Sequence, residues 1–186
     1  LVTAEYALGE VGGFTMHLAG TAFYPVQVAE KGICWVRATF RGEPGHGSMP
    51  RRDSAVIRLG EATAALGRAK FPVHPTAAVK DFLDGIAARQ PGFARPLLKM
   101  LARPELMARV VRLVPDLSIA RTLGALLTNT ASPTVVRAGN KVNVIPGVAE
   151  VNIDGRLLPG QTSDDFLREL RAVIGEDVEL EVVKSA

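Results

Sequence analysis

The residues best suited to chemistry lie in a glycine-rich stretch, Arg41 to Pro50, where His46 stands between two glycines. An imidazole held by such a backbone can donate a hydrogen bond to an oxygen that gains negative charge during a reaction. Glycine and serine are also ordinary turn residues, so the same stretch fits a solvated loop. A phosphate-binding loop is a weaker alternative, because no Lys-Ser or Lys-Thr pair follows the glycines. The pattern alone leaves the role of His46 open.

Asn143 and Arg156 are the next candidates, since both stand in stretches typical of β-strands. Asparagine is poorly suited to β-structure, and an arginine on a central strand is costly unless it is paired. Either side chain could therefore hold a ligand. Arg156 could equally pair with Asp154 or Glu150 on the polar face of its strand.

The remaining titratable residues do not complete an active site. Glu10 ends a short strand near glycines, and a single carboxylate cannot hold zinc, which takes about four ligands. We interpret His17 and His74 as structural, as lone histidines usually are. The chain also lacks the His-Glu-x-x-His, Gly-x-Ser-x-Gly and paired-carboxylate patterns of known hydrolases.

Length and composition indicate an ordinary globular protein. The chain has 186 residues, of which 47% are hydrophobic and 22% charged. The formal net charge of +3 comes from basic residues that are scattered along the chain, so the charge does not indicate an acidic partner. We expect neither nucleic acid nor a membrane as a partner. Cys34 is the single cysteine, which excludes an internal disulfide and leads us to expect a reducing, cytoplasmic location.

Two strands must position these candidates. In the first, residues 31–41, every second residue is apolar, which predicts one buried face made of Cys34, Val36, Ala38 and Phe40. In the second, residues 142–158, a strict alternation places Arg156 on the polar face and is interrupted by Pro146-Gly147. A turn at Gly139-Asn140 joins this strand to another over residues 128–138.

The remaining elements complete a fold prediction. A hairpin is expected over residues 14–28. A helix is expected over residues 53–69, with Asp53 as its N-cap and Val56 on its apolar face. A second helix is expected to begin with a Thr162–Asp165 capping box, and a last strand is expected over residues 178–183. Residues 76–127 remain helical in pieces, which indicates a helical insertion. Without it the order is βαββαβ, so we predict an α+β, ferredoxin-like antiparallel sheet with two helices on one face.

Four motifs follow one another along the chain: Glu30-Lys31-Gly32, the segment from Gly45 to Pro50, the segment from Ala138 to Pro146, and the segment from Asp154 to Gly160. In this order they resemble the aminoacylase and carboxypeptidase family of dinuclear zinc hydrolases, which includes carboxypeptidase S, carboxypeptidase G, acetylornithine deacetylase and succinyl-diaminopimelate desuccinylase. In that family these motifs belong to the lid, or dimerisation, domain, which is ferredoxin-like.

The resemblance implies roles for single residues. His46 matches the lid histidine that, in dimeric members, reaches into the partner subunit's active site and stabilises the oxyanion formed from an amide. Asn143 and Arg156 match lid residues that hold the substrate, commonly its carboxylate. Glu10 matches a zinc ligand, although Gly9 departs from the family's Asn-Glu-Gly or Asp-Glu-Gly pattern.

The resemblance also implies a domain division and an activity. Residues 1–27 would be a remnant of the catalytic zinc domain and residues 28–186 the lid. The family's other metal ligands do not occur in the sequence, so we expect two zinc ions in the full-length enzyme, none bound by this fragment, and no activity of the fragment alone. The long insertion resembles the carboxypeptidase S or aminoacylase branch, which predicts N-acyl amino acids or small peptides as substrates. Lids of this family usually pair through a helix and an edge strand, so the resemblance also implies a homodimer through the lid, with the helix at residues 53–69 as the candidate contact.

Two questions stay open at this point. The insertion could cover the substrate cleft or join the dimer contact. A free-standing ferredoxin-like regulatory module that binds a small molecule would have a similar fold. A nucleic-acid binder ranks last, because aromatic residues make up only 5% of the chain and no RNA-binding aromatic motif is present.

Overall fold

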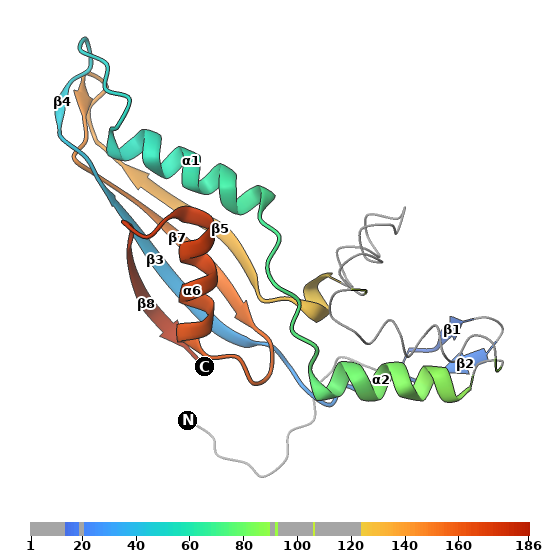
Figure 1. Cartoon of the computed structure of the whole chain (residues 1–186). Helices are drawn as coiled ribbons and strands as arrows, with labels where there is room; N and C mark the ends of the chain where they lie inside the picture. The colour runs from blue at the N-terminus through green and yellow to red at the C-terminus, as the bar shows by residue number, and fades with distance from the viewer. Residues whose placement is uncertain (1–13, 19–20, 90–91, 93–105, 107–123) are drawn as a thin grey trace.

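A four-stranded antiparallel sheet forms the centre of the protein (Figure 1). The structure is a computed structural model, and it describes residues 14–18, 21–89, 92, 106 and 124–186. The strands of the sheet, in spatial order, are β5 (Thr130–Ala138), β7 (Val148–Leu157), β3 (Gly32–Arg41) and β8 (Glu179–Ser185). The helix α1 (Ala55–Arg68) follows β3, and α6 (Ser163–Ile174) follows β7. This order confirms the predicted ferredoxin-like βαββαβ fold.

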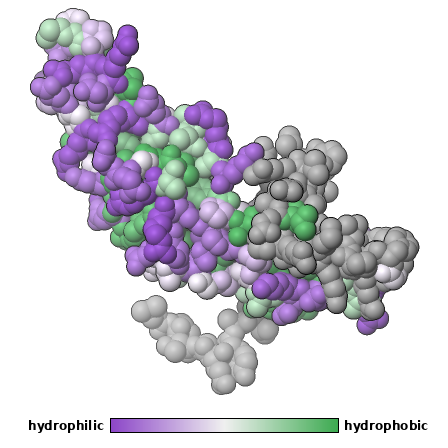
Figure 2. Space-filling view, in the orientation of Figure 1, coloured by the Kyte–Doolittle hydropathy of each residue, from purple (hydrophilic) through white to green (hydrophobic). Residues whose placement is uncertain are grey.

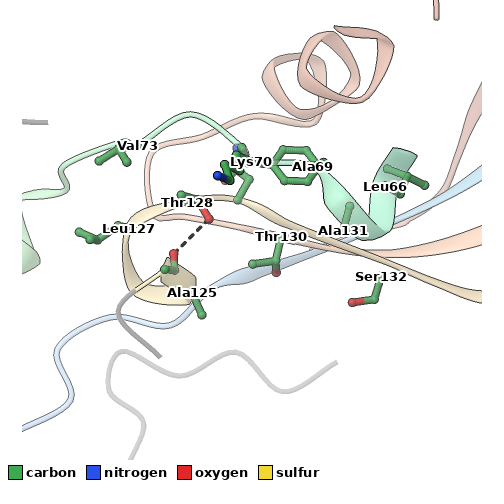
Figure 3. A pocket seen from close by; sticks show the side chains of 13 residues that line it. Leu66, Ala69, Lys70, Val73, Ala125, Leu127, Thr128, Thr130, Ala131 and Ser132 are labelled. Carbon is green, nitrogen blue, oxygen red and sulfur yellow. Dashed lines mark hydrogen bonds between the residues drawn. The ribbon is translucent and has the colours of Figure 1, made fainter. Parts of the chain in front are cut away.

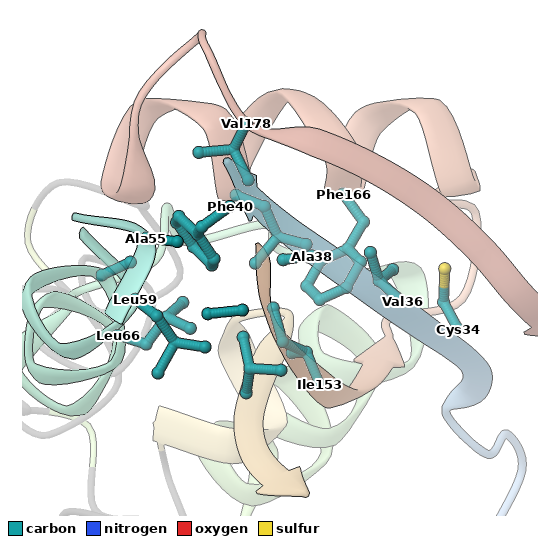
Figure 4. Close-up of a cluster of buried hydrophobic side chains, with 14 of the residues drawn as sticks. Cys34, Val36, Ala38, Phe40, Ala55, Leu59, Leu66, Ile153, Phe166 and Val178 are labelled. Carbon is teal, nitrogen blue, oxygen red and sulfur yellow. The ribbon is translucent and has the colours of Figure 1, made fainter. Parts of the chain in front are cut away.

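The two central strands, β3 and β7, pair along their whole length, from Gly32 opposite Leu157 to Arg41 opposite Val148. The alternating apolar residues of β3 are buried as predicted, each at most 2% exposed: Cys34, Val36, Ala38 and Phe40. The inward residues of β7 complete this face of the sheet, and Figure 4 shows them meeting side chains from both helices. The period of two in the sequence therefore locates the core.

Both helices cover the same face of the sheet. Phe166 of α6 and Leu59 of α1 lie in the common core, and Phe166 is completely buried. The predicted Thr162–Asp165 capping box starts α6. The prediction for α1 was wrong by one residue, because its N-cap is Ser54. The backbone turns helical only at Ala55, so the amide that a cap must bind belongs to Ile57, and it donates to Ser54 Oγ at 3.4 Å.

The apolar face of α1 also differs from the prediction. Its inward stripe consists of Ala55, Leu59, Ala62 and Leu66. Val56 lies to the side of this stripe and is 39% exposed, and the next residue, Ile57, is 45% exposed. Since residues 100° apart on a helix face different directions, the stripe that begins at Ala55 excludes Val56 from the core.

Smaller elements surround the main sheet. The hairpin predicted over residues 14–28 exists but is shorter, as β1 (Met16–Leu18) and β2 (Thr21–Phe23), and residues 24–28 are not in a strand. The insertion begins with α2 (Ala77–Ala88). Residues 124–127 are helical, while most of the insertion between α2 and this turn lies outside the described residues. Within the part of the chain that the structure describes, no helix combines the length and the apolar character needed to cross a membrane.

Candidate functional site

His46 and Asn143 come together at one end of the elongated sheet, which we call the tip (residues 42–50 and 139–147). Here β4 (Gly45–His46) pairs with β6 (Val144–Ile145), with His46 opposite Val144. The amide of Gly47 donates to the carbonyl of Asn143 at 2.8 Å. A Cβ on Gly47 would lie 3.4 Å from the backbone of Asn143, so glycine lets the two segments approach closely. The structure thus places two of the candidate residues, His46 and Asn143, side by side.

The hydrogen bonds of His46 determine which ring nitrogen can act as a donor. Ser48 N lies 3.3 Å from His46 Nδ1, and Ser48 Oγ lies 2.8 Å from the same atom. A backbone N–H can only donate, so Nδ1 acts as an acceptor in this contact. The neutral ring then carries its proton on Nε2. His46 is exposed and therefore presents an N–H donor to an incoming group.

The tip is largely hydrophilic at its surface (Figure 2). Glu43 and Arg51 form an ion pair across the loop. Two apolar side chains are nevertheless fully or mostly exposed there, Val142 at 106% and Met49 at 68%. Both side chains are therefore available for contact with another molecule.

Arg156 lies at the opposite end of the sheet from the tip. It stands on β7 opposite Ile33 and Thr130, whereas Val148, eight positions away on the same strand, stands next to the tip. At about 3.3 Å per residue, these eight positions span about 26 Å. The structure therefore does not bring Arg156 to His46 and Asn143 within one chain.

The Arg156 guanidinium is held by Asp154, two residues earlier on the same face of β7. Nε and Nη2 donate to the two oxygens of Asp154 at 2.9 and 3.1 Å. The indole N–H of Trp35 donates to the same carboxylate at 3.1 Å and fixes its orientation. Nη1 has no hydrogen-bond partner among the described residues, and 43% of the Arg156 side chain is exposed. The pairing with Asp154 thus leaves three of the five N–H donors, both of those on Nη1 and one on Nη2, for a ligand.

Lys31, part of the Glu30-Lys31-Gly32 motif, lies near Arg156. Its ammonium donates to the carbonyls of Ala125 and Thr128 at 3.0 and 2.9 Å and to Thr130 Oγ1 at 3.3 Å. Desolvation by burial, with a smaller effect from the positive charge of Arg156, lowers the pKa of Lys31 to about 8. These contacts join residues more than 90 positions apart, so no local pattern could have revealed them.

The other two histidines lie apart from this arrangement. Glu10 lies outside the described residues, and His17 is exposed on β1. His74 Nε2 lies 2.5 Å from Glu169 Oε1. The second oxygen of Glu169 accepts from the fully buried Asn129 at 3.0 Å. His74 is therefore part of a structural network.

The residues that the structure describes do not form a zinc site. Across residues 14–18, 21–89, 92, 106 and 124–186, no group of three or more His, Cys, Asp and Glu side chains is placed to hold a metal ion. Zinc takes about four such ligands, so these residues do not fit it. The described residues thus offer hydrogen-bond donors such as His46 and Arg156, but no set of ligands for a metal ion.

Comparison with known proteins places the domain in a family. The family model of the peptidase dimerisation domain (M20_dimer) matches residues 28–180. "Probable carboxypeptidase S-like 2" of Dictyostelium discoideum is 32% identical over 152 residues, which cover 82% of this chain and 28% of that protein. "N-fatty-acyl-amino acid synthase/hydrolase PM20D1" of Xenopus tropicalis is 28% identical over 162 residues, which cover 86% of this chain and 31% of that protein. The chain thus spans about three tenths of the length of these relatives.

Solved structures with similar folds include the "M20 family metallo-carboxypeptidase Sso-CP2" from Sulfolobus solfataricus. It is 16% identical, with a TM-score of 0.42, and the match covers 84% of this chain and 44% of that one. The family model spans most of the chain, from β3 through α6 to the start of β8. The chain therefore belongs to the peptidase dimerisation domain family, the dimerisation domain of M20 peptidases and amidohydrolases.

Proposed function

We propose that residues 28–186 form the lid and dimerisation domain of a zinc-dependent amidohydrolase or peptidase that cleaves N-acyl amino acids or small peptides. In this proposal residues 1–27 belong to the catalytic domain, where Glu10 is a zinc ligand. The two zinc ions are bound by the rest of the enzyme, and the lid contributes substrate contacts. The similarity to a probable carboxypeptidase S-like protein and to an N-fatty-acyl-amino acid synthase/hydrolase supports this substrate class.

The separation of His46 from Arg156 is the observation that carries the proposal. Both residues present unused N–H donors, but they lie at opposite ends of the sheet, and the length of β7 from the tip to Arg156 is about 26 Å. A small amide substrate cannot reach across that distance. If both residues serve one reaction, they must come from different chains.

The edges of the sheet suggest how two chains meet. β5 is one edge, and its side chains Val135 and Val136 are 40% and 54% exposed. The helix α1 packs against β5 and carries the exposed Val56 and Ile57. The other edge, β8, carries charged residues along its length, which discourage pairing. The apolar edge of β5 with α1 is therefore the better homodimer surface.

Pairing two copies of β5 across a twofold axis would run the strands antiparallel. β5 runs from Thr130, opposite Arg156, to Ala138, opposite Ala149 near the tip. Reversing the partner strand places the partner's tip at the Arg156 end of the first chain. The dimer would then bring His46 and Asn143 of one chain to Arg156 of the other. The exposed Val142 and Met49 would be covered in the same step.

The proposed roles follow from the donors that remain available. Arg156 Nη1 binds the substrate carboxylate while Asp154 holds the rest of the guanidinium in place. His46, with Nδ1 bonded to Ser48, turns its Nε2–H toward the amide oxygen as negative charge develops on it. Asn143 adds a polar contact beside the histidine.

A substitution of His46 tests the proposal. In the full-length enzyme, His46→Ala should lower kcat by about 10²- to 10³-fold, the cost of losing one oxyanion donor. Metal content and dimerisation should stay intact. His17→Ala, which removes an exposed histidine from β1, is the matched control and should leave kcat unchanged. Unchanged turnover in His46→Ala would remove the assigned role.

A further inference from the structure

The face of the sheet that the helices leave uncovered carries a hollow of about 350 Å³. Trp35 and Asp154 stand opposite each other on this face, because the residues that alternate with them, Val36 and Ile153, are buried under the helices. The volume falls in the range of about 300–1,000 Å³ that is usual for small-ligand sites. The outward side chains that line the hollow come from all four strands: Trp35, Thr134, Val135, Asn152, Asp154 and Val183.

Arg156 lies on the same face as this hollow. Its neighbour Gly155 points the other way, since a Cβ on Gly155 would lie 2.3 Å from the ring of Phe166 in the core. A separate pocket of about 440 Å³ (Figure 3) has Leu66 and Phe71 among its walls, and both pack in the core that the helices cover. Of the two sites, the hollow is therefore the one that shares a face with Arg156.

Asp154 connects the hollow to Arg156. It lines the hollow, and its carboxylate accepts Arg156 Nε and Nη2 at 2.9 and 3.1 Å. The indole of Trp35 donates to Asp154 Oδ1, the oxygen that also accepts Arg156 Nε. Asp154 and Arg156 stand two residues apart on β7, which is about 7 Å along the strand. A large side chain next to a carboxylate on Arg156 can span this separation.

The wall of the hollow is apolar and held in place. Trp35, Val135 and Val183 are 40%, 40% and 48% exposed, so a group that covers them removes apolar surface from water. The Trp35 ring is fixed by its hydrogen bond to Asp154 and by the ammonium of Lys184, which lies 5.0 Å from the ring centroid. A wall formed before a ligand arrives lowers the entropic cost of binding.

We propose that this hollow receives the apolar side chain of the substrate residue whose carboxylate binds Arg156, with Trp35 as its main wall. The inference rests on the proposed function. The α-carbon next to that carboxylate bears the amide nitrogen and the side chain. The amide must reach the reacting centre, which the proposed dimer places beyond the Arg156 end of the sheet. The side chain then points back toward Asp154 and the hollow. The site therefore selects N-acyl amino acids with large apolar side chains over N-acylglycine.

The test uses the 186-residue chain and three probes, with NMR shifts as the readout. Trp35 is the single tryptophan, so its indole N–H gives one unambiguous signal, which N-acetyl-L-phenylalanine should shift. This probe should bind about ten-fold more tightly than N-acetylglycine, because partial burial of an aromatic side chain contributes about this much. N-acetyl-L-phenylalaninamide, which lacks the carboxylate, should bind more weakly than the acid.

Two matched variants on β5 locate the effect. Val135 lines the hollow, whereas its neighbour Val136 does not line it and is also exposed. Both residues belong to the same edge strand, so an effect on dimerisation would be common to the two variants. Val135→Asn should reduce the preference for the phenylalanine probe by about three-fold or more, and Val136→Asn should keep it. Equal loss in both variants, or no loss in either, would contradict the proposal.

The outcomes separate the hollow from the proposed function. Equal binding of the two carboxylate probes, with both weakened by Arg156→Met, would refute the hollow alone. If the amide bound as tightly as the acid and Arg156→Met changed nothing, the carboxylate role of Arg156 would be wrong, and with it the link to the hollow. Shifts from none of the probes at their solubility limits would contradict both.

Discussion

Lys31 carries a charge that the folded protein disfavours, and this makes the stability of the domain depend on pH in a specific direction. The pKa of Lys31 is lowered to about 8, chiefly by burial. In the unfolded chain a lysine keeps its proton up to about pH 10.4. Between these values the unfolded state binds more protons than the folded state, so the free energy of unfolding rises with pH. The penalty is fully present below pH 8 and is removed as the pH increases.

The size of this effect follows from the same shift. From pH 8 to 9.5 an undamped site would contribute about 2 kcal/mol, at about 1.36 kcal/mol per pH unit. Because Lys31 is only half-buried, solvent screening reduces this to about 1 kcal/mol. We therefore expect the wild-type protein to gain about 1 kcal/mol over a Lys31→Met variant between pH 7 and 9.5.

Urea unfolding of the wild type and the Lys31→Met variant across this pH range measures the difference between their free energies of unfolding. The titration of all other groups cancels in this difference. Lys70→Met removes an exposed ammonium and is the matched control; its pH dependence should follow the wild type. A wild-type advantage that stays flat or falls as the pH rises would refute the reasoning, because it would mean that the hydrogen bonds of Lys31 outweigh its desolvation.

Three further predictions concern the fold and the dimer. Gly155→Ala should lower the free energy of unfolding by about 1–3 kcal/mol, because the added Cβ would lie 2.3 Å from the Phe166 ring. Gly60→Ala, on α1 with open space around it, should instead raise the free energy of unfolding. Equal effects of the two substitutions in denaturant titrations would contradict this contrast. Thr162→Ala removes the capping box of α6 and should cost about 1 kcal/mol in the same titrations; no loss would show that the cap is dispensable. Val136→Asp at the β5 edge should give a monomer by light scattering, and a persistent dimer would place the interface elsewhere.

The main sheet was predictable because its central strands obey a simple rule. β3 and β7 are each buried on one face only, and this produces the alternation seen in the sequence. The capping box of α6 was also readable, since both of its partners lie within one turn. Ser54 was missed because Asp53 beside it has the same propensity, and only the point where the backbone becomes helical separates them.

The candidate site was only partly predictable, because its contacts join segments far apart in the sequence. β4 and β6 have two residues each, too few for a periodic pattern, so nothing local places Asn143 beside His46. The alternation of β7 placed Arg156 on the polar face but could not choose between a ligand and Asp154 as its partner. The structure gives it Asp154 and still leaves Nη1 available. Lys31 and Asn129 make polar contacts that carry no periodic signal at all.

Mixing two inactive variants of the full-length enzyme tests the central claim, that one chain supplies His46 and the other Arg156. His46→Ala and Arg156→Ala should each be nearly inactive alone. In an equal mixture that has exchanged subunits, half of the dimers are hybrids, and each hybrid holds one site with both residues intact. The account predicts recovery of about one quarter of the wild-type activity. No recovery, in a mixture shown by mass spectrometry to contain hybrids, would mean that both residues serve the same subunit or that the dimer is built differently.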